Sequence, residues 1–281
     1  MPTGDILKWD GHTHGPYCHH GSDAAMADYI VRALELGFER ITLTEHPPLP
    51  DGWLEDQAVQ RTLAMPHVDL AQYLSDAKAA KELFADQIDV RVGLEVDFLY
   101  NNEQFTWSLF EQSVPAIDEV IISVHFLPGI GGMRCIDLTA QDMTAGLLAY
   151  YGSMERLLEI YFEHQEQAIQ LAKLFPVPAR LGHATLIDKF RRDLPAYDPL
   201  LRSQHLERIF SLLLKNGLAL DVNTAGLTLS SCGAMYPPME DVVTAWAMGV
   251  PCVFGSDAHA PEAIGRHYET YAQLPALAAR R

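Results

Sequence analysis

Histidine residues are concentrated near the start of this 281-residue chain. Four of the twelve lie within nine positions, in the stretch DGHTHGPYCHHGS at residues 10–22. His12 and His14 are separated by one residue, so on a β-strand both side chains would point to the same face and could bind one ion. Because a lone pair at this spacing is a weak signal, the rest of the chain must show whether it supplies further metal ligands.

Seven short β-rich runs along the chain end in residues that can bind a metal. The runs are KWDGH (8–12), ITLTEH (41–46), VRVGLEVDF (90–98), EVIISVHF (119–126), ARLGHA (179–184), LALDVNT (218–224) and VPCVFGSDAH (250–259). Helical patterns separate them, as at 24–37, at 69–84 and in a longer segment from about 139 to 174. This alternation favours strand-helix units and a mostly parallel sheet.

The potential ligands on these runs are His12, His14, His46, Glu95, His125, His183, Asp257 and His259. A single histidine after a strand is more often a hydrogen-bonded structural residue than a ligand. In a barrel of parallel strands, however, all the carboxyl ends meet at one rim. Six of seven runs ending in such residues therefore indicate a metal centre. Imidazole and carboxylate ligands without thiolate suit Zn, Fe or Mn and are typical of hydrolytic sites.

Composition restricts the class of protein. The formal charge is −17, which disfavours binding to nucleic-acid phosphates, and nearly half of the residues are hydrophobic, enough for a large core. The four cysteines (18, 135, 232 and 252) form no C-x-x-C pair, so we expect reduced thiols in a cytoplasmic protein. The first residues lack the pattern of a signal peptide, and no apolar run is long enough for a membrane span.

The motifs together resemble those of the PHP family of metal-dependent phosphoesterases, and within it the histidinol-phosphate phosphatases. The resemblance rests on DGHTHGPYCHHGS, LTEHPPLP, GLEVDF, SVHFLPG, GHATLIDKF, DVNTAGL and FGSDAH. It implies that residues 1–281 form a single domain, a distorted (β/α)7 barrel with its metal site at the C-terminal rim of the strands. It also implies three divalent transition-metal ions and hydrolysis of L-histidinol phosphate to L-histidinol and phosphate, a reaction of histidine biosynthesis.

The resemblance further implies nine metal ligands. His12, His14 and Asp257 would hold the first ion, and Glu95 would bridge it to the second. His125 and His183 would complete the second site, and His20, His46 and His259 would hold the third. His19 is left without a metal. Cys18 lies in the same loop, but we expect it to pack rather than bind metal, because the family pattern contains only nitrogen and oxygen ligands.

Hydrolysis of a phosphate monoester requires a strong nucleophile and neutralisation of phosphoryl charge, because the uncatalysed reaction is extremely slow. Metal ions can provide both by lowering the pKa of a bound water and holding the phosphate. The leaving alkoxide also needs a proton. We expect Glu95 and Asp257 to flank the nucleophile, and Asp257 and His259 are candidates for the acid, although the sequence does not choose between them or a metal-bound water.

A dianionic phosphate also calls for a cationic side chain. We favour Lys189 with Arg191, which follow the fifth run, and Arg134 is a further candidate, although each alone is more often a surface charge. Asn223 on the sixth run could contact substrate or cap its own loop, and the sequence favours neither. Thr228 departs from the pattern that the resemblance implies, because we would expect a basic residue after the NTAGL motif in several relatives.

Two other functions remain open at this stage. One is a PHP-type phosphoesterase that acts on another small phosphate ester or a nucleotide, because a fold and a metal cluster do not fix the substrate. The other is a non-catalytic metal-binding barrel. A degenerate barrel should lack at least one of the nine ligands, and all nine positions here carry a suitable residue.

Overall fold

A seven-stranded parallel sheet forms the centre of the computed structural model, which describes residues 6–280. In spatial order the strands are β1 (Trp9–Thr13), β2 (Arg40–Glu45), β3 (Asp89–Asp97), β4 (Glu119–Ser123), β7 (Ala179–Leu181), β8 (Ala219–Asn223) and β9 (Cys252–Gly255). Each of the seven β-rich runs overlaps one of them. The sheet curls round until the segment after β9 meets β1, where the His14 amide donates to the Ala258 carbonyl (2.8 Å). The expected (β/α)7-like barrel is confirmed.

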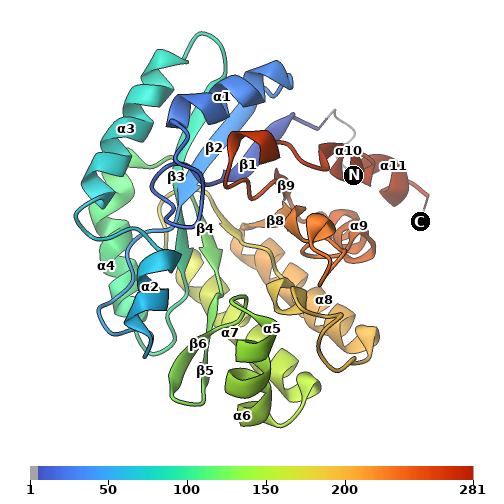
Figure 1. Cartoon of the computed structure of the whole chain (residues 1–281). Helices are drawn as coiled ribbons and strands as arrows, with labels where there is room; N and C mark the ends of the chain where they lie inside the picture. The colour runs from blue at the N-terminus through green and yellow to red at the C-terminus, as the bar shows by residue number, and fades with distance from the viewer. Residues whose placement is uncertain (1–5, 281) are drawn as a thin grey trace.

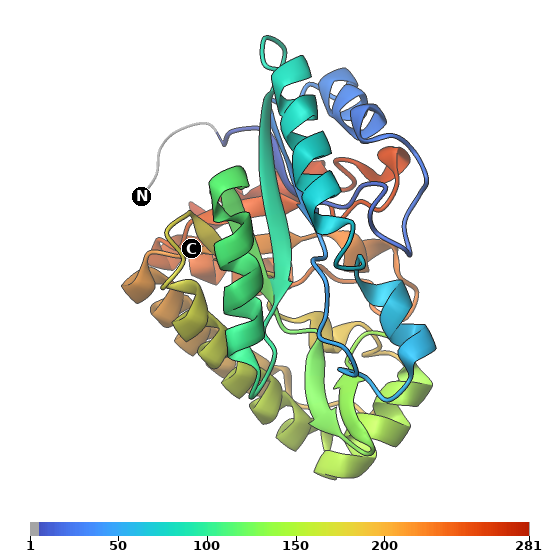
Figure 2. The same ribbon diagram turned by 90° about the vertical axis from the view of Figure 1, so that its left-hand side faces the viewer.

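Helices cover the outside of this sheet (Figures 1 and 2). The longer ones are α1 (Met26–Glu35), α3 (Leu70–Leu83), α4 (Glu103–Ser113), α7 (Met154–Ala172), α8 (Pro199–Asn216) and α9 (Met239–Met248). The shorter ones are α2 (Gln57–Leu63), α10 (Tyr268–Tyr271), α11 (Leu274–Ala278) and the 3₁₀ turns η1 (Val114–Ala116), η3 (Leu186–Asp188), η4 (Ala225–Thr228) and η5 (Pro261–Ala263). Within residues 6–280, no helix has the length and apolar character needed to cross a bilayer.

The fourth β-rich run departs from the simple strand that the sequence predicts. β4 ends at Ser123, and the chain then enters an antiparallel hairpin of β5 (Phe126–Gly129) and β6 (Gly132–Cys135). Figure 1 shows this hairpin standing off from the parallel sheet beside α5 (Ala140–Asp142) and α6 (Ala149–Tyr151). His125 lies at the junction, so the hairpin begins directly at the rim of the barrel.

The expected long helix over residues 139–174 is wrong, because the segment is interrupted. It contains α5 (Ala140–Asp142), the π-helical turn η2 (Met143–Leu148) and α6 (Ala149–Tyr151), and only then α7. The break falls at Gly152, whose φ of +85° is left-handed and easily adopted only by glycine. Ser153 then caps α7 by accepting a hydrogen bond from the Arg156 amide.

A buried ion pair joins strands at the amino end of the barrel. The Arg180 guanidinium on β7 donates to both oxygens of Glu119, the first residue of β4, at 3.0 and 3.1 Å. It also donates to the Gly11 carbonyl on β1 and lies over the Trp9 ring. The two side chains are only 3 % and 7 % exposed, so each charge depends on the other.

Replacing Arg180 by Met should therefore destabilise the fold, since it leaves the Glu119 carboxylate buried without a partner. We expect a loss of roughly 3 to 5 kcal/mol in the free energy of unfolding, measured by urea titration. Arg156→Met is the matched control, because Arg156 pairs with Glu159 on the exposed face of α7. Equal stability of the two variants would show that the buried pair does not support the barrel.

Candidate metal centre

The first ligand group gathers at the carboxyl ends of β1, β3 and β9. His12 Nε2 and His14 Nε2 lie 3.1 and 3.2 Å from Glu95 Oε2, and His14 Nε2 lies 3.4 Å from Asp257 Oδ1. Ligand atoms of a tetrahedral zinc site, with bonds of about 2.0 to 2.2 Å, are separated by about 3.3 to 3.6 Å. The spacing of these atoms therefore fits a single metal ion.

The second group shares Glu95 with the first. His183 Nε2 lies 2.8 Å from Glu95 Oε1, and His125 Nε2 lies 3.6 Å from the same oxygen. The two imidazole nitrogens are 3.1 Å apart. Because Oε1 faces this group and Oε2 faces the first, the carboxylate is oriented to bridge two ions.

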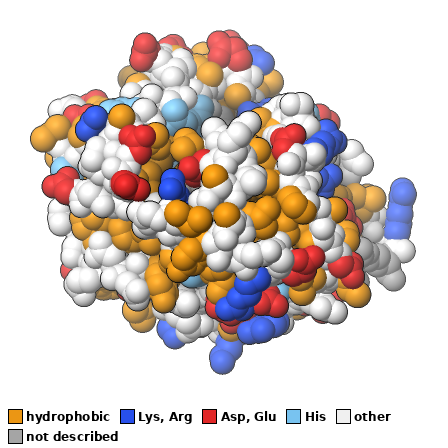
Figure 3. Space-filling view, turned by 60° about the horizontal axis from the view of Figure 1, so that its bottom comes forward, with side chains coloured by type: hydrophobic (Ala, Val, Ile, Leu, Met, Phe, Trp, Pro, Cys, Tyr) orange, Lys and Arg blue, Asp and Glu red, His pale blue; other side chains and the backbone are white. Residues whose placement is uncertain are grey.

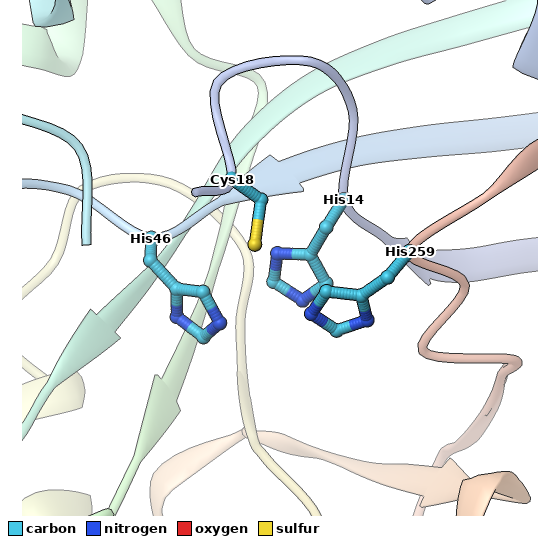
Figure 4. A group of neighbouring side chains, drawn as sticks. All are labelled: His14, Cys18, His46 and His259. Atoms are coloured by element: carbon cyan, nitrogen blue, oxygen red, sulfur yellow. The ribbon is translucent and has the colours of Figure 1, made fainter. Parts of the chain in front are cut away.

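The third group contains His46 and His259 from the set that the resemblance implied, together with His14 and Cys18, and it does not contain His20. The donor atoms of His14, Cys18, His46 and His259 all lie within 4.8 Å of one another, as Figure 4 illustrates. The His20 ring lies close by, with its centroid 4.7 Å from that of His259, while its Nδ1 is 2.8 Å from the Thr62 carbonyl oxygen.

The neighbouring histidine, His19, is also bound to α2 rather than to the metal groups. Its Nδ1 lies 2.9 Å from the Arg61 carbonyl oxygen, and the side chain is exposed. The two histidines that follow Cys18 therefore both anchor their loop to α2. His20 does so through Nδ1, which leaves its Nε2 available for a metal ion.

Two buried carboxylates orient the histidines from behind. Asp221 Oδ2 on β8 lies 2.9 Å from His12 Nδ1, and Asp97 Oδ1 on β3 lies 2.7 Å from His125 Nδ1. Such partners fix the tautomer and direction of a ligating imidazole. Sequence reasoning missed both, although strand periodicity could have found Asp97, which lies two residues after Glu95 and on the same face.

The charges of the ligand residues favour cation binding. Burial by itself raises the pKa of Glu95, but the imidazoles of His12, His46 and His125 hold it well below its usual range. Burial also raises the pKa of Asp257, but neighbouring histidines lower it by more, so the net result is a decrease. Burial lowers the pKa of His259 to about 3. The centre therefore offers carboxylates in their anionic form and a neutral imidazole, the forms that bind metals.

Two adjoining cavities of about 240 and 250 Å³ open onto these ligands. Both are lined by Lys189, whose Nζ donates to Asp137 Oδ2 at 2.9 Å. The second cavity is also lined by Arg266, Thr228 and Tyr236. Of these, Arg266 was not among the residues that the sequence indicated. Figure 3 shows this face of the molecule, where histidine side chains appear near a hollow that acidic and basic side chains border.

The other predicted substrate contacts do not line either cavity. Arg191 Nε donates to the Cys232 carbonyl, and Arg134 is bound to the Ile130 carbonyl and Asp142. Asn223 accepts from the Ala225 amide, so it caps its loop, and its Nδ2 donates to Asp257 Oδ2 at 3.1 Å. Of the four predicted contacts, only Lys189 reaches the cavities.

Comparison with known proteins shows the family of the chain. The PHP domain family model matches residues 10–225, and a PHP-associated model matches residues 244–273. The chain therefore belongs to the PHP family, whose first model covers well over half of its length. Within that family it is 33 % identical to the histidinol-phosphatase of Bacillus subtilis over 270 residues, which is 95 % of this chain and 98 % of the relative.

Solved structures show the same relationship. A Listeria monocytogenes protein described as a candidate histidinol phosphatase is 34 % identical, with a TM-score of 0.88 over 94 % of this chain and 100 % of that one. A histidinol phosphate phosphatase from Lactococcus lactis, solved with zinc, L-histidinol and phosphate, has a TM-score of 0.65 at 17 % identity over 98 % and 93 % of the two chains. Because the identity to the Lactococcus lactis protein is only 17 %, this similarity shows a shared fold and nothing more.

The hydrogen bond between Asp221 and His12 gives a direct test of the centre. Asp221→Asn keeps the shape but weakens the orientation of His12, so we expect metal affinity to fall by roughly 10- to 100-fold. Competition with a chromophoric chelator would measure it. Asp86→Asn, in the exposed turn after α3, is the control. Unchanged affinity in Asp221→Asn would mean that this carboxylate does not support a ligand.

Proposed function

We propose that this PHP-family phosphatase hydrolyses L-histidinol phosphate to L-histidinol and phosphate, as a step of histidine biosynthesis. The proposal rests on one observation: the adjoining ligand groups and Lys189 lie at the same two cavities. The identity to the Bacillus subtilis histidinol-phosphatase over nearly the full length of both chains supports the choice of substrate.

We further propose that the centre holds three divalent transition-metal ions, drawn from Zn, Fe and Mn. The ligands would be His12, His14, His20, His46, Glu95, His125, His183, Asp257 and His259. When bound, such ions supply Lewis acidity toward the phosphoryl group and acidify a water nucleophile. The two oxygens of Glu95, each turned toward a different pair of histidines, support its role as the bridging carboxylate.

Lys189 is the side chain that we propose binds the phosphate. Its ammonium lines both cavities and is held 2.9 Å from Asp137. Burial alone would lower the pKa of Lys189, but Asp137 raises it, so the group stays charged at neutral pH. Arg266 lines the second cavity together with Thr228, and its guanidinium adds positive charge to the same wall.

Proton transfer to the leaving alkoxide needs a group at the cavity wall. We propose Asp257 and His259 for this role. Because the Asp257 carboxylate is anionic and the His259 imidazole neutral, either would first accept the proton of the attacking water and then pass it to the alkoxide. Glu95 and Asp257 would flank the nucleophile. Both Asp257 and His259 line the second cavity, and Asn223 fixes the Asp257 carboxylate through its amide. His259 Nε2 has no hydrogen-bond partner among the described residues, so it is free to exchange a proton or bind an ion.

Phosphate release from a panel of esters tests the substrate. Protein purified without chelator should contain close to three metal ions per chain by elemental analysis. It should prefer L-histidinol phosphate over p-nitrophenyl phosphate and nucleoside monophosphates by orders of magnitude in kcat/KM. A flat profile would indicate another small ester as the substrate. Full metal content without any hydrolysis would favour the non-catalytic barrel.

Lys189→Ala separates phosphate binding from metal binding. We expect kcat/KM for L-histidinol phosphate to fall by roughly 10- to 100-fold with unchanged metal content, the effect of losing a charge-assisted hydrogen bond. Arg191→Ala should have a smaller effect, because Arg191 is bound to the Cys232 carbonyl and lies outside the cavities. The reverse order of effects would move the phosphate clamp from Lys189 to Arg191.

A further inference from the structure

Glu45 and His14 each leave one buried polar atom without a hydrogen-bond partner, and these two atoms are neighbours. Neither Glu45 Oε2 nor His14 Nδ1 has a partner among residues 6–280, and the two lie 3.8 Å apart. The Glu45 side chain is 1 % exposed and the His14 side chain is fully buried. Because an unpaired carboxylate oxygen and an unpaired ring nitrogen are both costly in such a place, the pair calls for an explanation.

The other ring nitrogen of His14 is the one turned toward the first ligand group. Its Nε2 lies 3.2 Å from Glu95 Oε2. The imidazole also stacks on the rings of His46 and His259, with each centroid 4.3 Å away, and Figure 4 shows these three side chains together. Stacking limits the rotation of the His14 ring, so its Nδ1 stays beside Glu45 when its Nε2 binds an ion.

The second oxygen of Glu45 anchors the loop that follows β1. Oε1 accepts hydrogen bonds from the Gly15 amide at 2.7 Å and from the Tyr17 amide at 3.2 Å. A Cβ at Gly15 would lie 3.2 Å from this oxygen, so glycine leaves the carboxylate room beside the backbone. Glu45 is also the last residue of β2. Because the strand fixes its backbone and two amides fix Oε1, Oε2 is held beside His14.

Buried carboxylates already lie behind two other imidazoles of the centre, those of His12 and His125, and each contacts Nδ1. Glu45 has the same relation to His14, at a longer distance. We propose that Glu45 is a positioning residue of the metal centre, whose Oε2 accepts the Nδ1 proton of His14 when Nε2 binds the first ion. The separation would then shorten to about 2.7 to 2.9 Å, the usual length of a hydrogen bond to a carboxylate.

One carboxylate would then join two parts of the centre. Oε2 sets the tautomer of His14 at the first position, because a proton held on Nδ1 leaves the Nε2 lone pair free for a metal. Oε1 holds the loop that also carries His20, a proposed ligand of the third ion. The inference rests on the proposed metal centre, but it does not depend on the identity of the substrate.

Glu45→Gln separates the contact with His14 from the anchoring of the loop. The glutamine oxygen can still accept from the Gly15 and Tyr17 amides, which leaves its NH₂ group toward His14 Nδ1. A donor in that place makes Nδ1 an acceptor and moves the ring proton to Nε2, where it blocks the metal. In chelator competition with zinc-loaded protein, we expect one ion per chain to be held roughly 10- to 100-fold more weakly than in the wild type.

Asp118→Asn is the matched control. Asp118 is likewise a carboxylate that accepts from a backbone amide, that of Val92 at 2.9 Å, but it lies just before β4 at the amino end of the barrel. The variant should hold zinc as the wild type does.

Nitrogen-15 NMR of the zinc-loaded protein detects the tautomer, which a merely structural role of Glu45 would not change. In the wild type, His14 should carry its ring proton on Nδ1, and in Glu45→Gln this signal should disappear. A wild-type His14 without a proton on Nδ1 would overturn the proposal. So would a Glu45→Gln variant with unchanged zinc affinity, or one that loses affinity but keeps the Nδ1 signal.

Neither measurement uses substrate. A zinc protein that behaves as expected in both but does not hydrolyse L-histidinol phosphate would therefore contradict only the proposed function.

Discussion

The buried carboxylate of Glu95 is the group on which the site depends. It is 1 % exposed and lies on β3, and imidazoles from β1, from the end of β4 and from the end of β7 surround its two oxygens. An anion in such a place requires compensating positive charge. Histidines alone supply this charge only when protonated, whereas metal ions supply it while leaving the imidazoles neutral. The arrangement is therefore that of a metal centre rather than a set of structural ion pairs.

The parallel barrel makes this concentration of ligands possible. Strands that all run in one direction deliver their last residues to one rim, so residues more than 240 positions apart, such as His12 and Asp257, come within 3.8 Å. The amino end of the same barrel is closed by the Arg180 and Glu119 pair. Stability and chemistry thus occupy opposite ends of the strands, as the architecture allows.

Segments beyond the strands shape the space above the metals. The β5-β6 hairpin brings Phe126 and Cys135 to one cavity, and α2 contributes Leu63 to the same wall. Asp137, just after β6, holds Lys189 over the ligands. The loop after β9 brings Arg266, whose guanidinium donates to the carbonyls of Ser256 and Asp257. This contact braces Asp257, whose φ of +52° is unusual for a residue other than glycine.

In the sequence, the alternation of strands and helices predicted a mostly parallel sheet, and the residues at the strand ends indicated a metal centre at one rim. The resemblance to the PHP family implied the (β/α)7 barrel and the grouping of Glu95 with His12, His14, His125 and His183. Only the tertiary structure decided which residues surround those ligands. Asp221, Lys189 and Arg266 take their roles from contacts with distant segments, and the break at Gly152 and the placement of Cys18 depend on local loop paths. Loops have no repeating geometry, so the direction of a side chain within them is set by packing rather than by spacing along the chain.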